Sequence, residues 1–415
     1  MNKLVVKLKQ HTPIIHFQHE QKGATLRASE LKPKLDKFII KHAFDEDFEE
    51  YKEFLIGWNE KKSRRDYADK KPLDYKIKIQ SNYVFRGSPE EPNKQLYFGN
   101  MGTGENKYSI FEPNDNTVII EFFSFNEKLI GIIKENISFF FAINNFGTRQ
   151  NKGFGSFYID PDDENYRNFM EVLKSTSELF LFIECDTNKD YNKQFDDISV
   201  IYNLMKSGIN NPDHPMINLV INGETQYKNG RPKKTPDYHI KGENAFYYRS
   251  FLFQYFHDLG VGNEKHFIKE NFFNAEVRIL DDGLPKNYLR AMLGICDGIK
   301  FRDDLRNEKI SYKSTVDRFK SPLTFKIVDN YIIIIPEVIP EKMKNLNFIF
   351  SLSHIDQNHI STPKKFDLKD FLKKYAEYFN NLDTSCLSGK RGKLVDMVKS
   401  AKLNRISIYE GANNA

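Results

Sequence analysis

The first seven residues after Asn2 alternate between an apolar face and a mostly basic one, and this alternation constrains how the chain begins to fold. In the segment Lys3–Lys9, Leu4, Val6 and Leu8 fall on one face, and the lysines fall on the other. A period of two residues is typical of a β-strand that buries one face and exposes the other. The segment therefore predicts a half-buried strand with a basic outer face.

A helix pattern follows this strand. Leu31, Leu35, Phe38 and Ile39 are spaced as i, i+4, i+7 and i+8, which places them on one face of a helix. Ser29 is the predicted N-cap of this helix. Further patterns predict an acidic helical segment at residues 45–60, strands at 74–80 and 117–125, a helix at 126–143 and a strand at 156–159. Counted with the two early helical segments as one layer, the order β-α-β-β-α-β predicts a ferredoxin-like unit, the arrangement that RNA-recognition modules also use.

The second half of the chain continues the alternation of strands and helices with longer insertions. Strand patterns occur at 178–185, 216–221, 323–328, 331–337 and 347–353, and helix patterns at 164–177, 196–208, 245–259 and 366–381. We interpret the whole as an α+β protein of tandem ferredoxin-like (RRM-like) domains with helical insertions. The predicted segments are residues 1–162, residues 163–384 and a loose, basic, polar tail at 385–415.

The segment Asn144–Phe157 joins a helix to a strand and is rich in glycine. Gly147, Gly153 and Gly155 flank two cations, Arg149 and Lys152. Glycine lets backbone amides approach a phosphate closely, and the cations add charge at the same place. No Gly-Lys-Ser/Thr follows, and the glycines end a helix rather than begin one, which excludes the common nucleotide-binding loops. Two interpretations stay open: a phosphate-binding turn or a surface turn with ordinary charges.

Composition excludes several classes of protein. The 415 residues contain 40% hydrophobic residues, enough for sizeable cores. The formal net charge of +5 is compatible with an anionic partner. Three widely spaced cysteines form no disulfide framework or Cys-x-x-Cys pair, which favours a cytoplasmic location. The apolar runs have the length of strands, so no membrane association is predicted, and no signal peptide is recognised at the N-terminus.

Histidines near the N-terminus are candidates for catalytic or metal-binding residues. His16 and His19 are spaced His-x-x-His, with His11 nearby. Three roles are open to them: solvated loop residues, RNA contacts, and a metal or general-base site. Acidic groups at 45–50 and 160–164 are interpreted as solvated or helix-capping carboxylates. No metal or cofactor is predicted.

Four short segments resemble one family. They are Thr12-Pro13 with the segment Leu26–Lys32, the glycine-rich stretch Gly147–Gly155, the segment Tyr288–Gly294, and Arg318-Phe319-Lys320-Ser321-Pro322-Leu323. In these segments the chain resembles the RAMP superfamily of CRISPR-associated proteins. Within that superfamily it is most similar to the family of the first subunit of the type III-B (Cmr) effector complex.

This resemblance implies a non-catalytic, RNA-binding subunit of a type III-B ribonucleoprotein that acts in antiviral defence. Its partners would be the 3′ region of crRNA, target RNA and other effector subunits. The residues carried over as RNA contacts are Arg27, Lys32, Lys34, Gly147, Arg149, Lys152, Gly153, Gly155 and Arg318.

Two further functions are compatible with the sequence. Some RAMP proteins are metal-independent endoribonucleases that process crRNA, and in this chain His16 or His19 would be the general acid or base. A protein-interaction scaffold without RNA contact is the third hypothesis.

Overall fold

The computed structural model describes most of the chain. The described residues are 2–16, 25–59, 72–81, 84–85, 109–113, 117–186, 190–211, 220–221, 224–225, 227–228, 231–232, 243–272, 283–295, 299–303, 306–316, 318–352 and 355–411. The chain divides into two compact units: unit 1 comprises residues 1–195, 324–335 and 408–415, and unit 2 comprises 196–323 and 336–407. These units do not coincide with the predicted segments 1–162, 163–384 and 385–415, because strands from the second half of the chain belong to unit 1.

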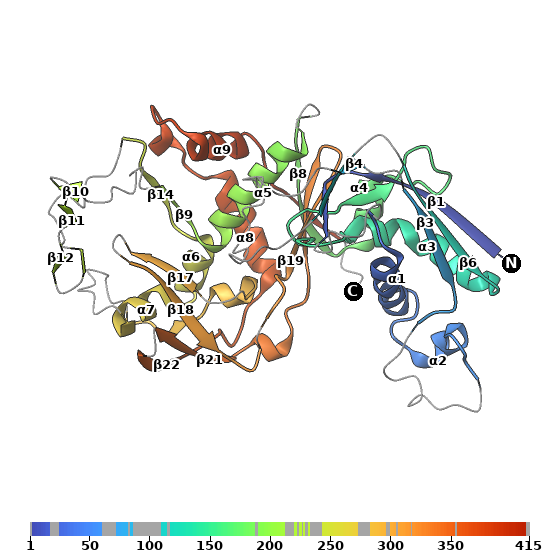
Figure 1. The fold of residues 1–415 in the computed structure, drawn as a ribbon, viewed down its shortest axis with the longest axis horizontal. Helices are drawn as coiled ribbons and strands as arrows, with labels where there is room; N and C mark the ends of the chain where they lie inside the picture. Colours follow the sequence, from blue (N-terminus) through green and yellow to red (C-terminus); the bar gives the residue numbers. More distant parts are fainter. Residues whose placement is uncertain are drawn as a thin grey trace. The chain divides into compact units, whose positions relative to one another are not determined.

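The alternating N-terminal segment is the central strand β1 (Asn2–Gln10) of a four-stranded sheet in unit 1 (Figure 1). The order is β3-β6-β1-β7, and every pairing is antiparallel. The other strands are β3 (Lys76–Gln80), β6 (Val118–Ser124) and β7 (Phe157–Ile159). Leu4, Val6 and Leu8 are buried while Lys3 and Lys7 are exposed, which confirms the predicted strand and its basic outer face.

Two helices cover the apolar face of this sheet. Helix α1 (Ala28–His42) and helix α3 (Glu127–Ile143) bury their apolar stripes in the same core as Leu4 and Val6. Asn126 caps α3, where its side chain accepts a hydrogen bond from the Leu129 amide at 3.2 Å. The predicted N-cap of α1 was wrong. Arg27 occupies that position and Ser29 lies within the first turn, so its hydroxyl has no capping geometry.

The remaining elements of unit 1 are short. The helix predicted at 45–60 was too long: the described residues 45–59 contain only helix α2 (Phe48–Tyr51) and a 3₁₀ turn, and Asp45 and Glu46 adopt a positive φ that an α-helix excludes. The elements are β2 (Ile14–His16), β4 (Val84–Phe85) and β5 (Ser109–Glu112), which form a sheet, α2 (Phe48–Tyr51), η1 (Lys52–Phe54) and α4 (Phe169–Thr176). A second four-stranded sheet has the order β19-β20-β8-β23. Its strands are β8 (Leu179–Glu184), β19 (Leu323–Val328), β20 (Tyr331–Pro336) and β23 (Ser407–Glu410).

Unit 2 contains a six-stranded sheet of order β15-β16-β22-β21-β18-β17 and a set of aromatic-rich helices. Phe371, Tyr375 and Phe379, which are spaced as i, i+4 and i+8, are fully buried on one face of helix α8 (Leu368–Asn380). Helix α5 (Tyr191–Lys206) begins in unit 1 and continues into unit 2. The other helices are α6 (Phe251–Asp258), α7 (Glu264–Phe272), α8 (Leu368–Asn380) and α9 (Lys393–Lys402), with 3₁₀ turns η5 (Arg290–Leu293), η6 (Glu341–Met343) and η7 (Ser385–Leu387). The strands are β9 (Ile209–Asn211), β10 (Val220–Ile221), β11 (Glu224–Thr225), β12 (Tyr227–Lys228), β13 (Arg231–Pro232), β14 (Phe246–Tyr248), β15 (Gly262–Asn263), β16 (Lys286–Asn287), β17 (Ile299–Asp303), β18 (Arg306–Lys313), β21 (Asn347–Leu352) and β22 (Ile355–Ser361).

The expectation of a loose tail after residue 385 was wrong. Helix α9 buries Val395, Val398 and Ala401, and β23 joins the second four-stranded sheet. The exposed face of α9 is rich in basic residues, so the composition of the segment did not indicate its short apolar stripe. The architecture is α+β with several antiparallel sheets, as predicted. Within the described residues, no helix is both long enough and apolar enough to cross a bilayer.

Candidate nucleic-acid interface

The glycine-rich turn between α3 and β7 adopts the backbone that its sequence indicates. Gly147, Gly153 and Gly155 have φ angles of 76°, 90° and 66°, and Arg149 also has a positive φ of 61°. A Cβ on Gly155 would lie 1.9 Å from the carbonyl oxygen of Phe146. The absence of a side chain therefore serves close packing of the protein backbone.

The glycine amides are bonded inside unit 1. The Gly147 amide donates to Glu30 Oε1 at 2.8 Å, and the Gly155 amide donates to the Pro13 carbonyl at 2.8 Å. The Gly153 amide donates to the Gln150 carbonyl at 3.3 Å. These contacts correct the expected mechanism, in which glycine amides bind phosphates, because the donors are already used to hold the turn.

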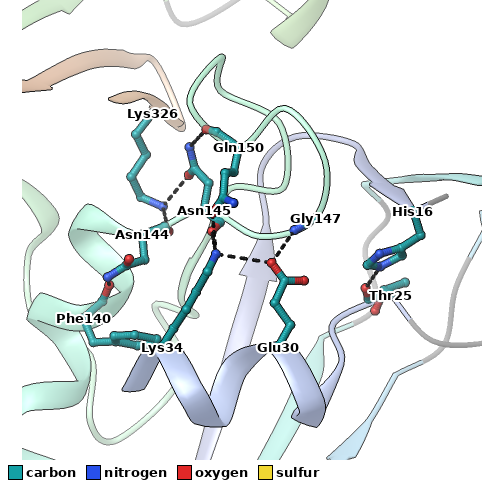
Figure 2. A network of polar contacts seen from close by, with 10 residues as sticks. All are labelled: His16, Thr25, Glu30, Lys34, Phe140, Asn144, Asn145, Gly147, Gln150 and Lys326. Carbon is teal, nitrogen blue, oxygen red and sulfur yellow. Dashed lines mark hydrogen bonds and ion pairs between the residues drawn. The ribbon is translucent and has the colours of Figure 1, made fainter. Parts of the chain in front are cut away.

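Two lysines contact the turn from other elements of unit 1 (Figure 2). Lys34 on α1 donates to the Asn145 carbonyl at 2.7 Å and also bonds the side chain of Gln150. Lys326 on β19 donates to the Asn144 carbonyl at 2.9 Å and to Asn145 Oδ1 at 3.1 Å. Helix α1 and strand β19 therefore fix the start of the turn.

Lys326 is fully buried and bonds no carboxylate among the described residues. Its third acceptor is the Phe157 carbonyl at 3.1 Å. Burial lowers the pKa of Lys326 well below its ordinary value, and the positive charge of Lys34 lowers it further. Sequence reasoning missed this residue. The available signal was a single charged residue inside a mostly apolar strand, Leu323–Val328.

Arg149 and Lys152 lie on the turn itself and are half-buried. The backbone of Lys152 forms an isolated parallel bridge with Phe325 of β19. The Asn151 carbonyl accepts a hydrogen bond from the Phe325 amide at 3.1 Å. The two predicted cations are thus carried by a turn whose backbone is bonded to a neighbouring strand.

Lys32 has an inward position on α1. Its ammonium group bonds Asp36 Oδ2 at 3.0 Å and the Leu73 carbonyl at 2.8 Å, and it lies 3.9 Å from the centroid of the Tyr75 ring. Burial lowers the pKa of Lys32, while Asp36 opposes the shift. Arg27 occupies the N-cap position of the same helix and is half-buried.

Arg318 is exposed and belongs to unit 2, whereas the other predicted contacts belong to unit 1. It lies between β18 and β19 in the chain. Arg318 and the glycine-rich turn therefore belong to different units.

His16 is buried in strand β2. Its Nε2 lies 2.6 Å from the Thr25 carbonyl, and its ring meets Phe111 edge-on. Burial lowers the pKa of His16. His19 lies outside the described residues. In the described part of the chain, no three His, Cys, Asp or Glu side chains are grouped so that they could hold a metal ion.

Two models of known protein families match this chain. Residues 1–209 match the model of the Cmr1 N-terminal domain, and residues 247–399 match that of the Cmr1 C-terminal domain. The two matches define a type III-B RAMP protein, as the resemblance in its motifs indicated. The chain belongs to the Cmr1 family.

Two solved structures are similar to this chain at low identity. The crystal structure of Cmr1 from Pyrococcus furiosus (apo form) is 12% identical, with 82% of this chain and 90% of that chain covered and a TM-score of 0.40. The cryo-EM structure of the type III-B Cmr-beta bound to cognate target RNA contains a chain that is also 12% identical. That match covers 38% of this chain and 58% of the other, with a TM-score of 0.25. A comparison with curated proteins found no match.

Proposed function

We propose that this chain is an RNA-binding subunit of a cytoplasmic type III-B CRISPR ribonucleoprotein that serves antiviral defence. In this role it contacts the 3′ region of crRNA and helps to capture target RNA, together with other effector subunits. The observation that carries the proposal is the match of both Cmr1 domains, in chain order, over most of the sequence.

We also propose that the chain contains two ferredoxin-like folds, which do not coincide with units 1 and 2. The elements β1, α1, β3, β6, α3 and β7 follow one another along the chain, and their sheet has the order β3-β6-β1-β7. The elements β8, α5, β19, β20, α8 and β23 follow in the same way, and their sheet has the order β19-β20-β8-β23. Numbered within each set, both sheets have the order 2-3-1-4, which supports a repeated β-α-β-β-α-β plan with a long insertion at 207–322.

The predicted RNA contacts take two roles in this proposal. Arg27, Arg149 and Arg318 bind phosphates directly through charged side chains, and Lys152, whose Nζ is buried, adds positive charge beside them. The remaining predicted residues hold the turn or the helix that carries these cations: Lys32, Lys34, Gly147, Gly153 and Gly155. Their internal hydrogen bonds support this assignment.

We propose that the subunit cleaves no RNA. The burial of His16 and its short contact with a backbone carbonyl support a structural role for this side chain. A cleavage assay with repeat RNA in EDTA tests the alternative. Specific cuts that disappear in the His16→Ala or His19→Ala variant would establish the endoribonuclease instead.

The double variant Arg149→Ala with Lys152→Ala tests the RNA contact. Each phosphate contact to a single strand contributes about 0.7 to the dependence of log affinity on log salt, so loss of the Arg149 contact reduces the slope by at least about 0.7. Fluorescence anisotropy with labelled guide RNA over a salt series measures this slope. The control exchanges Lys128 and Lys134 on α3 for alanine, two exposed lysines with the same charge. Equal slopes in both variants would contradict the assignment.

Mass spectrometry of proteins and RNA that co-purify with the tagged chain tests the assembly. We expect guide RNA and other effector subunits. Recovery of protein partners without RNA would favour the scaffold hypothesis.

A further inference from the structure

The outer face of the first sheet in unit 1, whose strands β1, β6 and β3 are labelled in Figure 1, carries side chains in a regular arrangement that the strand pairing defines. Because β1, β6 and β3 pair in register, their outward residues align in three rows. The first row is Lys3, Phe123 and Lys76; the second is Val5, Glu121 and Lys78; the third is Lys7, Ile119 and Gln80. We call these nine residues the lysine face.

The charge of the lysine face is unbalanced. Lys3 bonds Glu121 at 3.1 Å, which uses the single carboxylate of the lysine face. Lys7, Lys76 and Lys78 are exposed, and their ammonium groups have no carboxylate within 4 Å among the described residues; the carboxylate of Asp163 bonds only the backbone amide of Lys7. Three cations therefore lie within a patch about 10 Å wide across the strands and about 13 Å long along them, since adjacent strands are about 4.8 Å apart and each residue of a strand adds about 3.3 Å.

An aromatic ring lies between two of these lysine positions. Phe123 is directly opposite Lys3 on one neighbouring strand and Lys76 on the other. It is half-buried, and Lys3 Nζ lies 5.5 Å from its ring centroid. Phe125, just after β6, is 87% exposed. A partly exposed aromatic ring among lysines combines base stacking with phosphate neutralisation, the two interactions that bind a single strand.

We propose that the lysine face binds a single-stranded RNA segment. Lys7, Lys76 and Lys78 contact its phosphates, and a base stacks on Phe123. This inference rests on the proposed RNA-binding function and adds a site separate from the glycine-rich turn. It adds contacts that the four matching motifs do not contain.

The lysine face has two other conceivable roles, protection of the sheet edge and binding of a protein, and its residues match both less well than they match RNA binding. Lysines on an edge strand prevent unwanted strand pairing, and β3 is an edge strand. However, Lys7 lies on the interior strand β1, where no edge needs protection. A protein partner would also fit an open sheet, but lysine is depleted in protein interfaces. Unpaired lysines with an aromatic ring favour a polyanion that carries bases.

The test compares two triple variants of the full chain. The first exchanges Lys7, Lys76 and Lys78 for glutamine. The control exchanges Lys37, Lys128 and Lys134 for glutamine; these are exposed lysines of α1 and α3, which pack on the opposite face of the sheet. Anisotropy with a labelled uridine 20-mer measures affinity and salt slope, and circular dichroism checks the fold of each variant.

We expect the first variant to bind at least tenfold more weakly near 0.1 M salt, with a slope reduced by about 2, while the control changes little. Phe123→Ala should weaken binding about tenfold without changing the slope, since stacking carries no net charge. Equal affinity of the two triple variants would overturn the lysine face but leave the proposed function intact. Failure of the unmodified chain to bind any RNA would overturn both. If the first variant keeps its RNA affinity but loses a co-purifying subunit, the face is a protein interface.

Discussion

Lys34 Nζ lies 2.7 Å from the carbonyl oxygen of Asn145, so helix α1 is bonded to the first residues of the glycine-rich turn. The same ammonium group lies 3.2 Å from Glu30, whose carboxylate accepts the Gly147 amide. One turn of α1 therefore holds both a carbonyl and an amide of the glycine-rich turn. A lysine that sequence patterns assign to RNA contact is instead part of the support for the turn.

The exchange Lys34→Met should lower the free energy of unfolding by about 1–2 kcal/mol, because it leaves the Asn145 carbonyl without this donor and removes one of the two donors to Glu30. Lys37→Met on the exposed side of the same helix is the matched control and should change stability by less than about 0.5 kcal/mol. Urea denaturation of both variants measures the difference. Similar values would show that the ammonium group does not stabilise the turn.

The exchange Gly155→Ala should lower the free energy of unfolding by about 3 kcal/mol or more, or prevent folding. The added methyl group would meet the Phe146 carbonyl at 1.9 Å, on a backbone with a φ of 66°. Gly57→Ala has a similar φ of 68° but open space around the new methyl group, so only the backbone strain of about 1 kcal/mol applies. Thermal and urea unfolding compare the two. Losses of equal size would mean that the clash is relieved by a shift of the turn.

The exchange Lys326→Met should lower the free energy of unfolding by about 1–3 kcal/mol. Methionine fills the space, but the Asn144 and Phe157 carbonyls and the Asn145 side chain lose a shared donor. Lys320→Met, on an exposed lysine, is the control. Urea denaturation at pH 7 gives the values. A more stable Lys326→Met variant would show that removal of a buried charge outweighs the lost hydrogen bonds.

The lowered pKa of His11 predicts that the stability of the protein depends on pH. Its Nδ1 accepts a hydrogen bond from the Asp329 amide at 3.1 Å, and burial lowers its pKa from 6.5 to about 3, although the Asp329 carboxylate opposes the shift. Between these values the unfolded chain binds the proton and the folded chain does not. The free energy of unfolding therefore falls as the pH is lowered from 6.5 towards 3, by at most about 1.4 kcal/mol per pH unit for this group.

The exchange His11→Gln keeps an acceptor for the Asp329 amide and removes the titrating group. We expect a shallower loss of stability between pH 6.5 and 5 than in the unmodified chain. Urea denaturation at three pH values in this range measures the slope. Identical slopes would show that other groups cause the acid sensitivity.

Around the first sheet, sequence patterns predicted some structural features correctly and others wrongly. The alternation in Lys3–Lys9 and the spacing of Leu31, Leu35 and Phe38 predicted strand β1 and the buried face of α1, and both are confirmed. Ser29 failed as the N-cap because the identity of a capping residue does not fix the residue at which the helix begins. The same limit applies to 385–415, where a short apolar stripe was hidden among basic residues.

In the glycine-rich turn, sequence patterns could not predict the hydrogen-bond partners of the backbone. Its glycines and cations were visible in the sequence, but the acceptors of its amides and the donors to its carbonyls were not. Lys326 reaches Asn144 across 182 residues of chain, and Thr12 reaches Gly153 across 141.

By itself the sequence determined the periodic elements, their order along the first unit and the family to which the motifs belong, because each of these depends on residues close together in the chain. Only the tertiary structure decided that Lys34 and Lys326 support the turn while Lys7, Lys76 and Lys78 face outward together. The physical reason is that pairing register and burial arise between segments far apart in the chain, and they determine which charges are bonded internally and which remain exposed.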